Sequence, residues 1–174
     1  MPDEVLREKL TIHIDRHPFY ESINKRIEEE LAVNQTPFVY DEDSIWKGYK
    51  SNIKGWKASL NNEYKSIKLL EVWILSLVKD KCWGINCDIE SWIAKYDEGH
   101  YTIDHDHIPA TYSFVYFLKC PKGSSPLVFT TSGKKIKAEE GKIVIFPGCV
   151  RHYVPKNKGK GRMTFSGNLF YVDP

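Results

Sequence analysis

The first part of the chain carries apolar residues at helical spacing. Phe19, Ile23, Ile27 and Leu31 follow one another about four residues apart, with Glu and Lys between them. Residues at this spacing share one face of a helix. Pro18 marks the start, because proline is tolerated in the first turn of a helix. An amphipathic helix that begins at Pro18 is therefore predicted.

A second, longer apolar pattern predicts a helix that ends near Lys79-Asp80-Lys81. Between the two helices, Thr36–Tyr40 favours a short strand, and Trp46–Trp56 indicates an aromatic-rich loop. The apolar positions of the second helix are Leu60, Tyr64, Ile67, Leu70, Ile74, Leu77 and Val78.

From Ile85 onward the pattern changes to short apolar runs separated by turn residues such as Gly99, Pro109 and Gly141. Such runs are typical of β-strands. The predicted strands are Ile85–Tyr96, Tyr101–His107, Tyr112–Lys119, Leu127–Thr131, Lys135–Ala138, Ile143–Phe146, His152–Val154 and Met163–Val172.

About eight short strands at this spacing favour a small antiparallel barrel or jelly roll. The predicted class is α+β, with a double-stranded β-helix (a cupin-like barrel) as the leading architecture and the N-terminal helices packed on one outer face. A length of 174 residues suits one domain. Residues 1–84 would be its helical front, and residues 85–174 its barrel core.

Composition narrows the class of protein. Hydrophobic residues make up 41% of the chain and charged residues 28%, which favours a packed core over disorder. The four cysteines (Cys82, Cys87, Cys120 and Cys149) form no CxxC pair. They indicate reduced thiols rather than a zinc ribbon or a thioredoxin-like site. No apolar run has the length of a membrane span, and Met1–Leu10 is too charged for a signal peptide. A soluble cytoplasmic protein without a membrane partner is expected.

Basic residues are concentrated late in the chain. Residues 119–162 hold eleven lysines and arginines against two glutamates. Such a segment could attract an anionic ligand or nucleic acid. The favoured interpretation is a solvated lysine surface on loops such as Lys156–Lys160.

Histidines provide the first candidate chemistry. Side chains two apart on a strand share a face, so His105 and His107 can both point into a barrel. A third imidazole from His152 would complete a facial metal triad. A slip of one residue would instead turn Asp104 and Asp106 inward. Three imidazoles would also suit Zn, Cu or Ni.

Arg162 is the second candidate. It follows His152 by ten residues across a Lys/Gly-rich hairpin, so it can return on a neighbouring strand with Thr164 and Ser166 on the same face. A guanidinium beside a hydroxyl suits a bidentate grip on a carboxylate.

The second half of the chain resembles the 2-oxoglutarate- and Fe(II)-dependent oxygenases, on the prolyl-hydroxylase-like side of that superfamily. It is most similar to small members from phages and marine bacteria in which His-x-His stands in for His-x-Asp. The motifs that carry the resemblance, in one order, are Tyr96-x-x-Gly99-x-Tyr101, His105-x-His107, Ser113–Leu118, Gly141–Pro147, His152 and Arg162-x-Thr164.

The resemblance implies a hydroxylase that uses Fe(II), O2 and 2-oxoglutarate and releases succinate and CO2. It implies that His105, His107 and His152 hold the iron. It also implies that Arg162 holds the far carboxylate of 2-oxoglutarate with help from Thr164 and Tyr96, since Tyr96 matches a tyrosine used in this way by prolyl hydroxylases.

Two other classes stay open on sequence grounds. A three-histidine cupin-type dioxygenase that does not use 2-oxoglutarate shares the barrel, although it gives Arg162 no role. A non-catalytic β-barrel binding module would leave the histidines structural. No motif in the sequence identifies the substrate. A protein residue or a small molecule is favoured over a nucleic-acid base.

Overall fold

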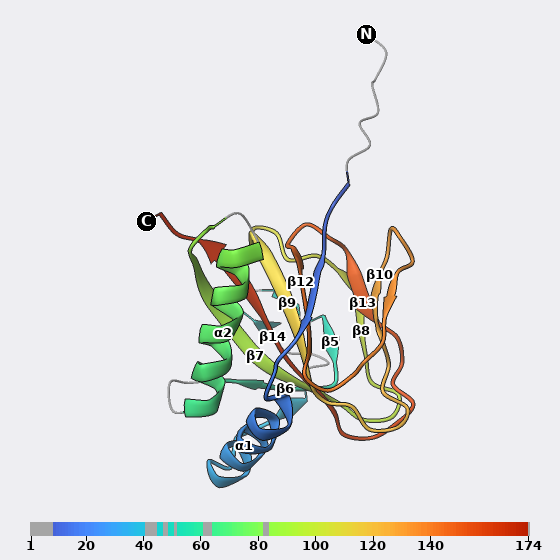
Figure 1. The fold of residues 1–174 in the computed structure, drawn as a ribbon. Coiled ribbons are helices and arrows are strands. Elements are labelled where there is room, and N and C mark those ends of the chain that lie inside the picture. The colour runs from blue at the N-terminus through green and yellow to red at the C-terminus, as the bar shows by residue number, and fades with distance from the viewer. Residues whose placement is uncertain are drawn as a thin grey trace.

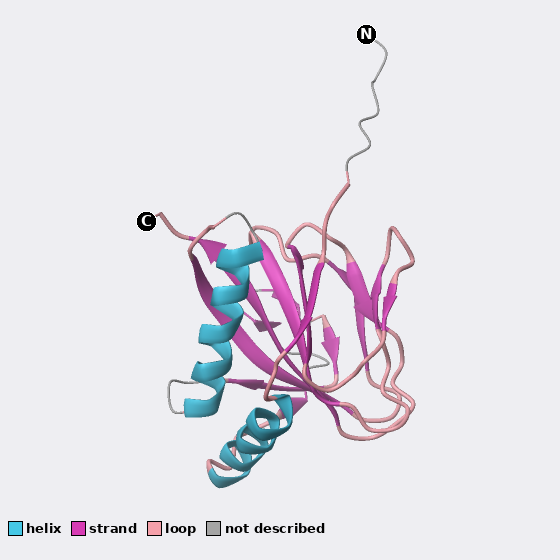
Figure 2. Cartoon of the chain, in the orientation of Figure 1, coloured by secondary structure: helices cyan, strands magenta, loops and turns pink. Residues whose placement is uncertain are grey.

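The computed structural model describes residues 9–40, 45–46, 49–50, 52–60, 64–81 and 84–173, with backbone only at 45–46 and 49–50. Two helices lie beside two main antiparallel sheets (Figures 1 and 2). The seven-stranded sheet has the order β1-β12-β9-β14-β7-β6-β2, and the five-stranded sheet has the order β11-β10-β13-β8-β5. A third, two-stranded sheet pairs β3 with β4. The chain is thus mostly β-sheet with two helices.

The element bounds follow chain order. They are β1 His13–Arg16, α1 Tyr20–Val33, β2 Val39–Tyr40, β3 Ile45–Trp46, β4 Tyr49–Lys50, β5 Ile53–Lys54, β6 Trp56–Ser59, α2 Lys65–Lys81, β7 Cys87–Tyr96, β8 Tyr101–His105, β9 Tyr112–Lys119, β10 Leu127–Phe129, β11 Lys135–Ile136, β12 Lys142–Pro147, β13 His152–Val154 and β14 Arg162–Tyr171.

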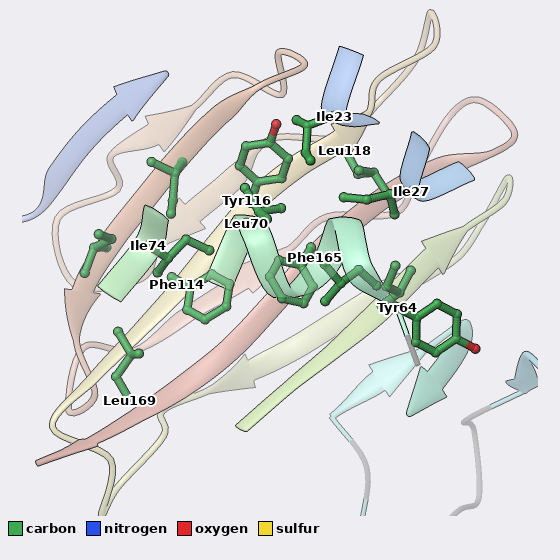
Figure 3. Close-up of a cluster of buried hydrophobic side chains, with 14 of the residues drawn as sticks. Ile23, Ile27, Tyr64, Leu70, Ile74, Phe114, Tyr116, Leu118, Phe165 and Leu169 are labelled. Carbon is green, nitrogen blue, oxygen red and sulfur yellow. The ribbon is translucent and has the colours of Figure 1, made fainter. Parts of the chain in front are cut away.

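Both helices pack on the outer face of the seven-stranded sheet, as predicted (Figures 1 and 3). Ile27 of α1 and Leu70 and Ile74 of α2 are fully buried against apolar side chains of the central strands, such as Phe165. Alternate residues of β14 point to this face, because side chains alternate along a strand. This layer is the larger of two hydrophobic cores and is remote from the histidines.

One polar side chain joins α1 to the sheet. Asn24 is buried, donates from Nδ2 to the carbonyl of Leu118 at 2.7 Å, and accepts the Tyr116 hydroxyl at 2.7 Å. Because a buried amide must find partners, these bonds fix where α1 lies over β9. Neither helix of the described chain has the length and apolar character that a membrane span requires.

A second core lies between the two sheets. Val115, Phe117 and Val144 come from the seven-stranded sheet, and Phe129 and Val154 come from the five-stranded one. The central strand β9 is buried on both faces, which explains its unbroken apolar sequence. The space between the sheets is where the candidate site forms.

The first 84 residues contribute more strands than the one predicted at Thr36–Tyr40. β1 pairs with β12, with His13 opposite Ile145, and β6 pairs with β7. β1 is short and mostly exposed, so only its ladder hydrogen bonds mark it as a strand. The segment predicted as the loop Trp46–Trp56 contains β5, which pairs with β8. The strand predicted at Thr36–Tyr40 is reduced to β2.

Candidate metal centre and anion pocket

Three histidines converge between the sheets. His105 ends β8, His107 lies two residues beyond it, and His152 begins β13 directly opposite His105 in the strand pairing. One ring nitrogen from each lies within 4.8 Å of the others. The ring centroids are 4.4 Å apart for His105 and His152 and 4.8 Å apart for His105 and His107. This spacing allows one metal ion to be shared by the three side chains.

A β-bulge aims these side chains. His152 lies opposite His105, but Val154 lies opposite Thr102, so the register shifts between the two pairs. An extra residue on β8 breaks the strict alternation of faces. Thr102 and His105, three residues apart, therefore both line the same cavity.

Backbone carbonyls orient two of the rings. Nδ1 of His105 lies 2.7 Å from the carbonyl of Ile103, and Nδ1 of His152 lies 3.0 Å from the carbonyl of Val150. A carbonyl can only accept, so we assign the proton of each ring to Nδ1. The Nε2 lone pairs are then free for a metal, which is the usual arrangement of metal-binding histidines.

Burial keeps the histidines neutral. Burial, with a further contribution from the neighbouring His105, lowers the pKa of His152 to about 4. Burial and the neighbouring imidazoles lower the pKa of His107 to about 2, and burial also lowers the pKa of His105. Neutral imidazole is the form that binds metals.

The two aspartates beside these histidines face away from the cluster. Asp104 and Asp106 both contact Arg151, at 3.0 Å and 3.3 Å. The structure thus brings together the three histidines and places both carboxylates on the other side of the strand. The sequence allowed two registers, one with the histidines facing the barrel interior and one with the aspartates facing it. The structure has the first.

A close backbone approach holds His107 in place. The His107 N–H donates to the carbonyl of Gly148 at 2.7 Å, and the Gly148 N–H donates to the carbonyl of Thr111 at 3.1 Å. A Cβ at position 148 would lie 2.1 Å from the carbonyl oxygen of Ala110. Only glycine fits at this position, because any side chain would collide with backbone.

Arg162 begins β14 and is fully buried between the sheets. Its Nε donates to the carbonyl of Ser125 at 3.0 Å. Its guanidinium lies 4.6 Å from the ring centroid of Tyr96 and 5.6 Å from that of Phe117. Nη1 and Nη2 find no hydrogen-bond partner among the described residues. Two buried donors on one cation, both unsatisfied, indicate a site for an anion.

Hydroxyl groups surround this guanidinium. Thr164 and Ser166 lie on its face of β14, with the Ser166 hydroxyl donating to that of Thr164 at 3.3 Å. The hydroxyls of Tyr96 and Thr102 are 2.8 Å apart. These groups, Arg162 and the three histidines line one cavity, which encloses roughly 420 Å³ of empty space when its open mouth is counted.

The sequence matches no protein-family model and none of the curated proteins. Its structure is similar to three solved hydroxylases. A Pseudomonas putida prolyl-4-hydroxylase matches with a TM-score of 0.69 at 14% identity, covering 93% of both chains. A viral collagen prolyl hydroxylase from Paramecium Bursaria Chlorella virus-1, in a 2OG complex, matches with a TM-score of 0.65 at 16% identity, covering 91% of this chain and 94% of the other.

The third is a prolyl hydroxylase from Trichoplax adhaerens in complex with a peptide fragment of the hypoxia inducible factor oxygen degradation domain. Its TM-score is 0.67 at 17% identity, and the match covers 93% of this chain and 83% of the other. The chain has the prolyl-hydroxylase fold. Below 25% identity the likeness establishes the fold, and the chemistry rests on the residues described above.

Within this prolyl-hydroxylase fold, several residues of the site were not predicted from the sequence. Ser125 reaches Arg162 from a loop, Thr102 joins the cavity only through the bulge, and Trp92 places its ring 6.2 Å from that of His107. Asn157 is buried although it lies in a Lys/Gly-rich run that suggests an exposed loop. Only the residue type could have indicated a structural role for Asn157, because asparagine side chains commonly form hydrogen bonds to the backbone in turns.

Proposed function

We propose that the protein is an Fe(II)- and 2-oxoglutarate-dependent oxygenase that hydroxylates its substrate within a double-stranded β-helix. The observation that carries this proposal is the buried guanidinium of Arg162, whose Nη1 and Nη2 have no hydrogen-bond partner among the described residues, in the same cavity as three neutral imidazoles. The buried cation calls for an anion, and three converging neutral imidazoles suit a metal. A metal together with a cosubstrate that has a carboxylate at its far end would fit both features.

The donor set fits these groups. His105, His107 and His152 would hold the metal through Nε2. Arg162 would bind the far carboxylate through Nη1 and Nη2, because a planar guanidinium can donate to both carboxylate oxygens at once. The hydroxyls of Thr164 and Tyr96 would add hydrogen bonds to it. When bound, iron and 2-oxoglutarate supply the oxidising chemistry, with O2 as the oxidant and succinate and CO2 as coproducts.

The charge of the site supports an anionic cosubstrate. Three neutral imidazoles do not offset the charge of a divalent cation, and Arg162 adds a further positive charge. Val115, Leu127 and Val154 form part of the cavity wall, and charges beside such apolar side chains interact more strongly than they do in water. A cupin-type dioxygenase without 2-oxoglutarate would leave Arg162 unpaired, so this alternative is disfavoured.

A protein residue or a small molecule is proposed as substrate in preference to nucleic acid. The Trichoplax adhaerens hydroxylase of similar fold is complexed with a peptide. The lysine-rich loop 156–160 contacts loop 121–125 behind Arg162, with the Lys158 N–H donating to the carbonyl of Gly123. Next to His107 the chain presents Trp92, an aromatic surface suited to a side chain or a peptide.

Anaerobic titration of the Fe(II) protein with 2-oxoglutarate, followed by metal-to-ligand charge-transfer absorbance, tests the proposal. Arg162→Ala should weaken 2-oxoglutarate binding by about 2–5 kcal/mol, roughly 30- to several-thousand-fold, because the buried carboxylate is left unpaired. Arg162→Lys should recover only part, since an ammonium lacks the planar fork.

Two controls accompany this titration. Arg16→Ala removes an exposed arginine that donates to the Glu140 carbonyl and should leave 2-oxoglutarate affinity unchanged. Fe(II) binding should be unaffected by Arg162→Ala but abolished by His105→Ala and His152→Ala. If wild type develops no charge-transfer band, or Arg162→Ala binds 2-oxoglutarate as tightly as wild type, the oxygenase assignment is wrong.

A further inference from the structure

Behind the histidine cluster, Arg151 ties together the two aspartates that alternate with His105 and His107 in sequence. Its Nε donates to Oδ2 of Asp104 at 3.1 Å, and its Nη1 donates to Oδ2 of Asp106 at 3.3 Å. Nη2 lies 3.0 Å from Oδ2 of Asp104 and donates to the Asp104 carbonyl at 3.1 Å. One guanidinium therefore engages both carboxylates and the backbone of β8.

This arrangement matters because carboxylates are good ligands for iron. Two histidines and one carboxylate form a common Fe(II) site, and Asp104 and Asp106 each adjoin His105. A displacement of one residue along the strand would exchange imidazoles for carboxylates at the metal. Some feature of the structure must therefore decide which set faces inward.

Strand pairing alone does not decide it. β8 ends at His105, so Asp106 and His107 lie beyond its ladder. The register between β8 and β13 already shifts at the bulge before His105. Around a bulge and a strand end, side-chain contacts have more influence on which face a residue takes.

The contacts of Arg151 supply that influence. The Thr130 hydroxyl donates to Oδ1 of Asp104 at 2.5 Å, and the Thr130 N–H donates to the Arg151 carbonyl at 3.0 Å. The Ile108 N–H donates to the other oxygen of Asp106 at 3.3 Å. These contacts join residues at the ends of β8, β10 and β13, which are neighbours in the five-stranded sheet, on the face opposite the three histidines.

The same contacts contribute little to global stability. The side chains of Arg151 and Asp104 are 49% and 38% exposed, and an ion pair this exposed contributes about 0–1 kcal/mol. The value of the network lies in its geometry, because a planar fork fixes the direction of each carboxylate.

We propose that Arg151 is a positioning residue that sets the ligand identity of the metal site by holding Asp104 and Asp106 on the outer face. The inference rests on the proposed metal site formed by the three histidines. Without Arg151, Asp104 and Asp106 lose the contacts that hold them on the outer face, and they compete with the imidazoles for the metal.

Co(II) is the probe, because its d–d absorption spectrum depends on the ligands and can be followed without turnover. Arg151→Met should weaken Co(II) binding by about 10- to 100-fold, as loss of a group that orients ligands does, and should alter the spectrum. Arg151→Lys, which keeps the charge without the fork, should recover part of the affinity. Lys137→Met removes another exposed ion pair, with Glu139, away from the histidines and should change neither quantity.

A mutant cycle separates positioning from a general structural role. In the Asp104→Asn/Asp106→Asn background no carboxylate is available to compete, so adding Arg151→Met should have little further effect on Co(II) affinity or spectrum. An equal loss in both backgrounds, or an unchanged spectrum for Arg151→Met alone, would overturn the inference while leaving the metal site intact. Failure of wild type to bind Co(II) would overturn the metal site itself, and this inference with it.

Discussion

The buried imidazole of His152, the half-buried imidazoles of His105 and His107 and the fully buried guanidinium of Arg162 share a cavity, and burial affects the two kinds of group differently. The histidines respond by becoming neutral, with the pKa of His152 lowered to about 4. Burial also lowers the pKa of Arg162, but a guanidinium stays charged in proteins. The imidazoles are therefore stable alone, whereas Arg162 is destabilising until an anion reaches it.

The neutral histidines predict acid sensitivity of the metal-free protein. His152 has a folded-state pKa of about 4 against an ordinary value of 6.5. The unfolded chain therefore takes up a proton first as the pH falls, and the free energy of unfolding should decrease between about pH 6.5 and 4. The part of this decrease that comes from His152 should amount to a few kcal/mol at most, at about 1.4 kcal/mol for each pKa unit, and His107 and His105, whose pKa values are also lowered, add to it.

Urea unfolding with a chelator present, at pH values from 7 to 4.5, measures this effect. His152→Gln should have a flatter dependence, because the titrating group is gone. A wild-type unfolding free energy that stays constant between pH 6.5 and 5 would show that His152 is not held neutral.

Spacing in the sequence predicted that His105, His107 and His152 converge, although His107 lies beyond the end of β8. Arg162 was predicted on a strand next to His152, and this was wrong: β14 lies in the other sheet, between β7 and β9, and Arg162 reaches the same cavity from across the gap between the sheets. Thr102, Ser125 and Gly148 were not predictable, because a bulge, a loop carbonyl and a close backbone approach bring them to the site. None of these leaves a pattern in the order of apolar and polar residues.

Among the loops and strands, the paired loops 121–125 and 156–160 determine the shape of the anion pocket. Asn157 connects them: its Nδ2 donates to the carbonyls of Tyr96 at 3.2 Å and Gly159 at 2.7 Å, and its Oδ1 accepts from the Ser125 N–H at 2.9 Å. The Ser125 carbonyl in turn holds Nε of Arg162. The buried amide thus fixes the far end of the pocket.

Asn157→Ala should therefore weaken 2-oxoglutarate binding by about tenfold or more, because several buried hydrogen bonds of about 1 kcal/mol each are lost and Arg162 is less well placed. Metal affinity should change little, since the histidines lie on β8 and β13. Parallel titrations with Fe(II) and with 2-oxoglutarate distinguish the two effects.

Lys158→Ala, an exposed neighbour in the same loop, serves as the matched control and should bind 2-oxoglutarate normally. Equal losses of metal and 2-oxoglutarate affinity in Asn157→Ala would indicate general unfolding rather than a role in the pocket.

Strands were predicted well where they are long and apolar, as in β9, and poorly where they are short and exposed. β1 is held by backbone ladder bonds to β12 rather than by burial of alternate side chains. Hydrophobic periodicity measures burial, so it cannot detect such a strand. β5 was assigned to a loop for another reason: Ile53 is buried, but two residues are too few to show an alternating pattern.

Across the whole molecule, the helix layer and the site occupy opposite faces of the seven-stranded sheet. Stability and binding should therefore respond to different mutations. Ile74 of α2 is fully buried in the helix layer, and Ile74→Ala should lower the free energy of unfolding by about 2–5 kcal/mol. Fe(II) affinity of the folded protein should not change.

Val72→Ala on the same helix is the control, because Val72 is 66% exposed and its loss should stay within about 0.5 kcal/mol. Urea unfolding and metal titration of both variants check the prediction. A fall in metal affinity that parallels the loss of stability in Ile74→Ala would show that the two faces are coupled.

The position of β14 has a consequence for biosynthesis. It follows every other strand in the chain, yet it lies in the middle of the seven-stranded sheet between β7 and β9. On the ribosome, β7-β6-β2 and β9-β12-β1 are translated before the strand that joins them, so each half presents an unpaired edge to other chains. Pairing over such sequence distances is slow. The nascent protein is thus most prone to aggregate just before β14 emerges, and because Arg162 begins this strand, the anion pocket is completed last.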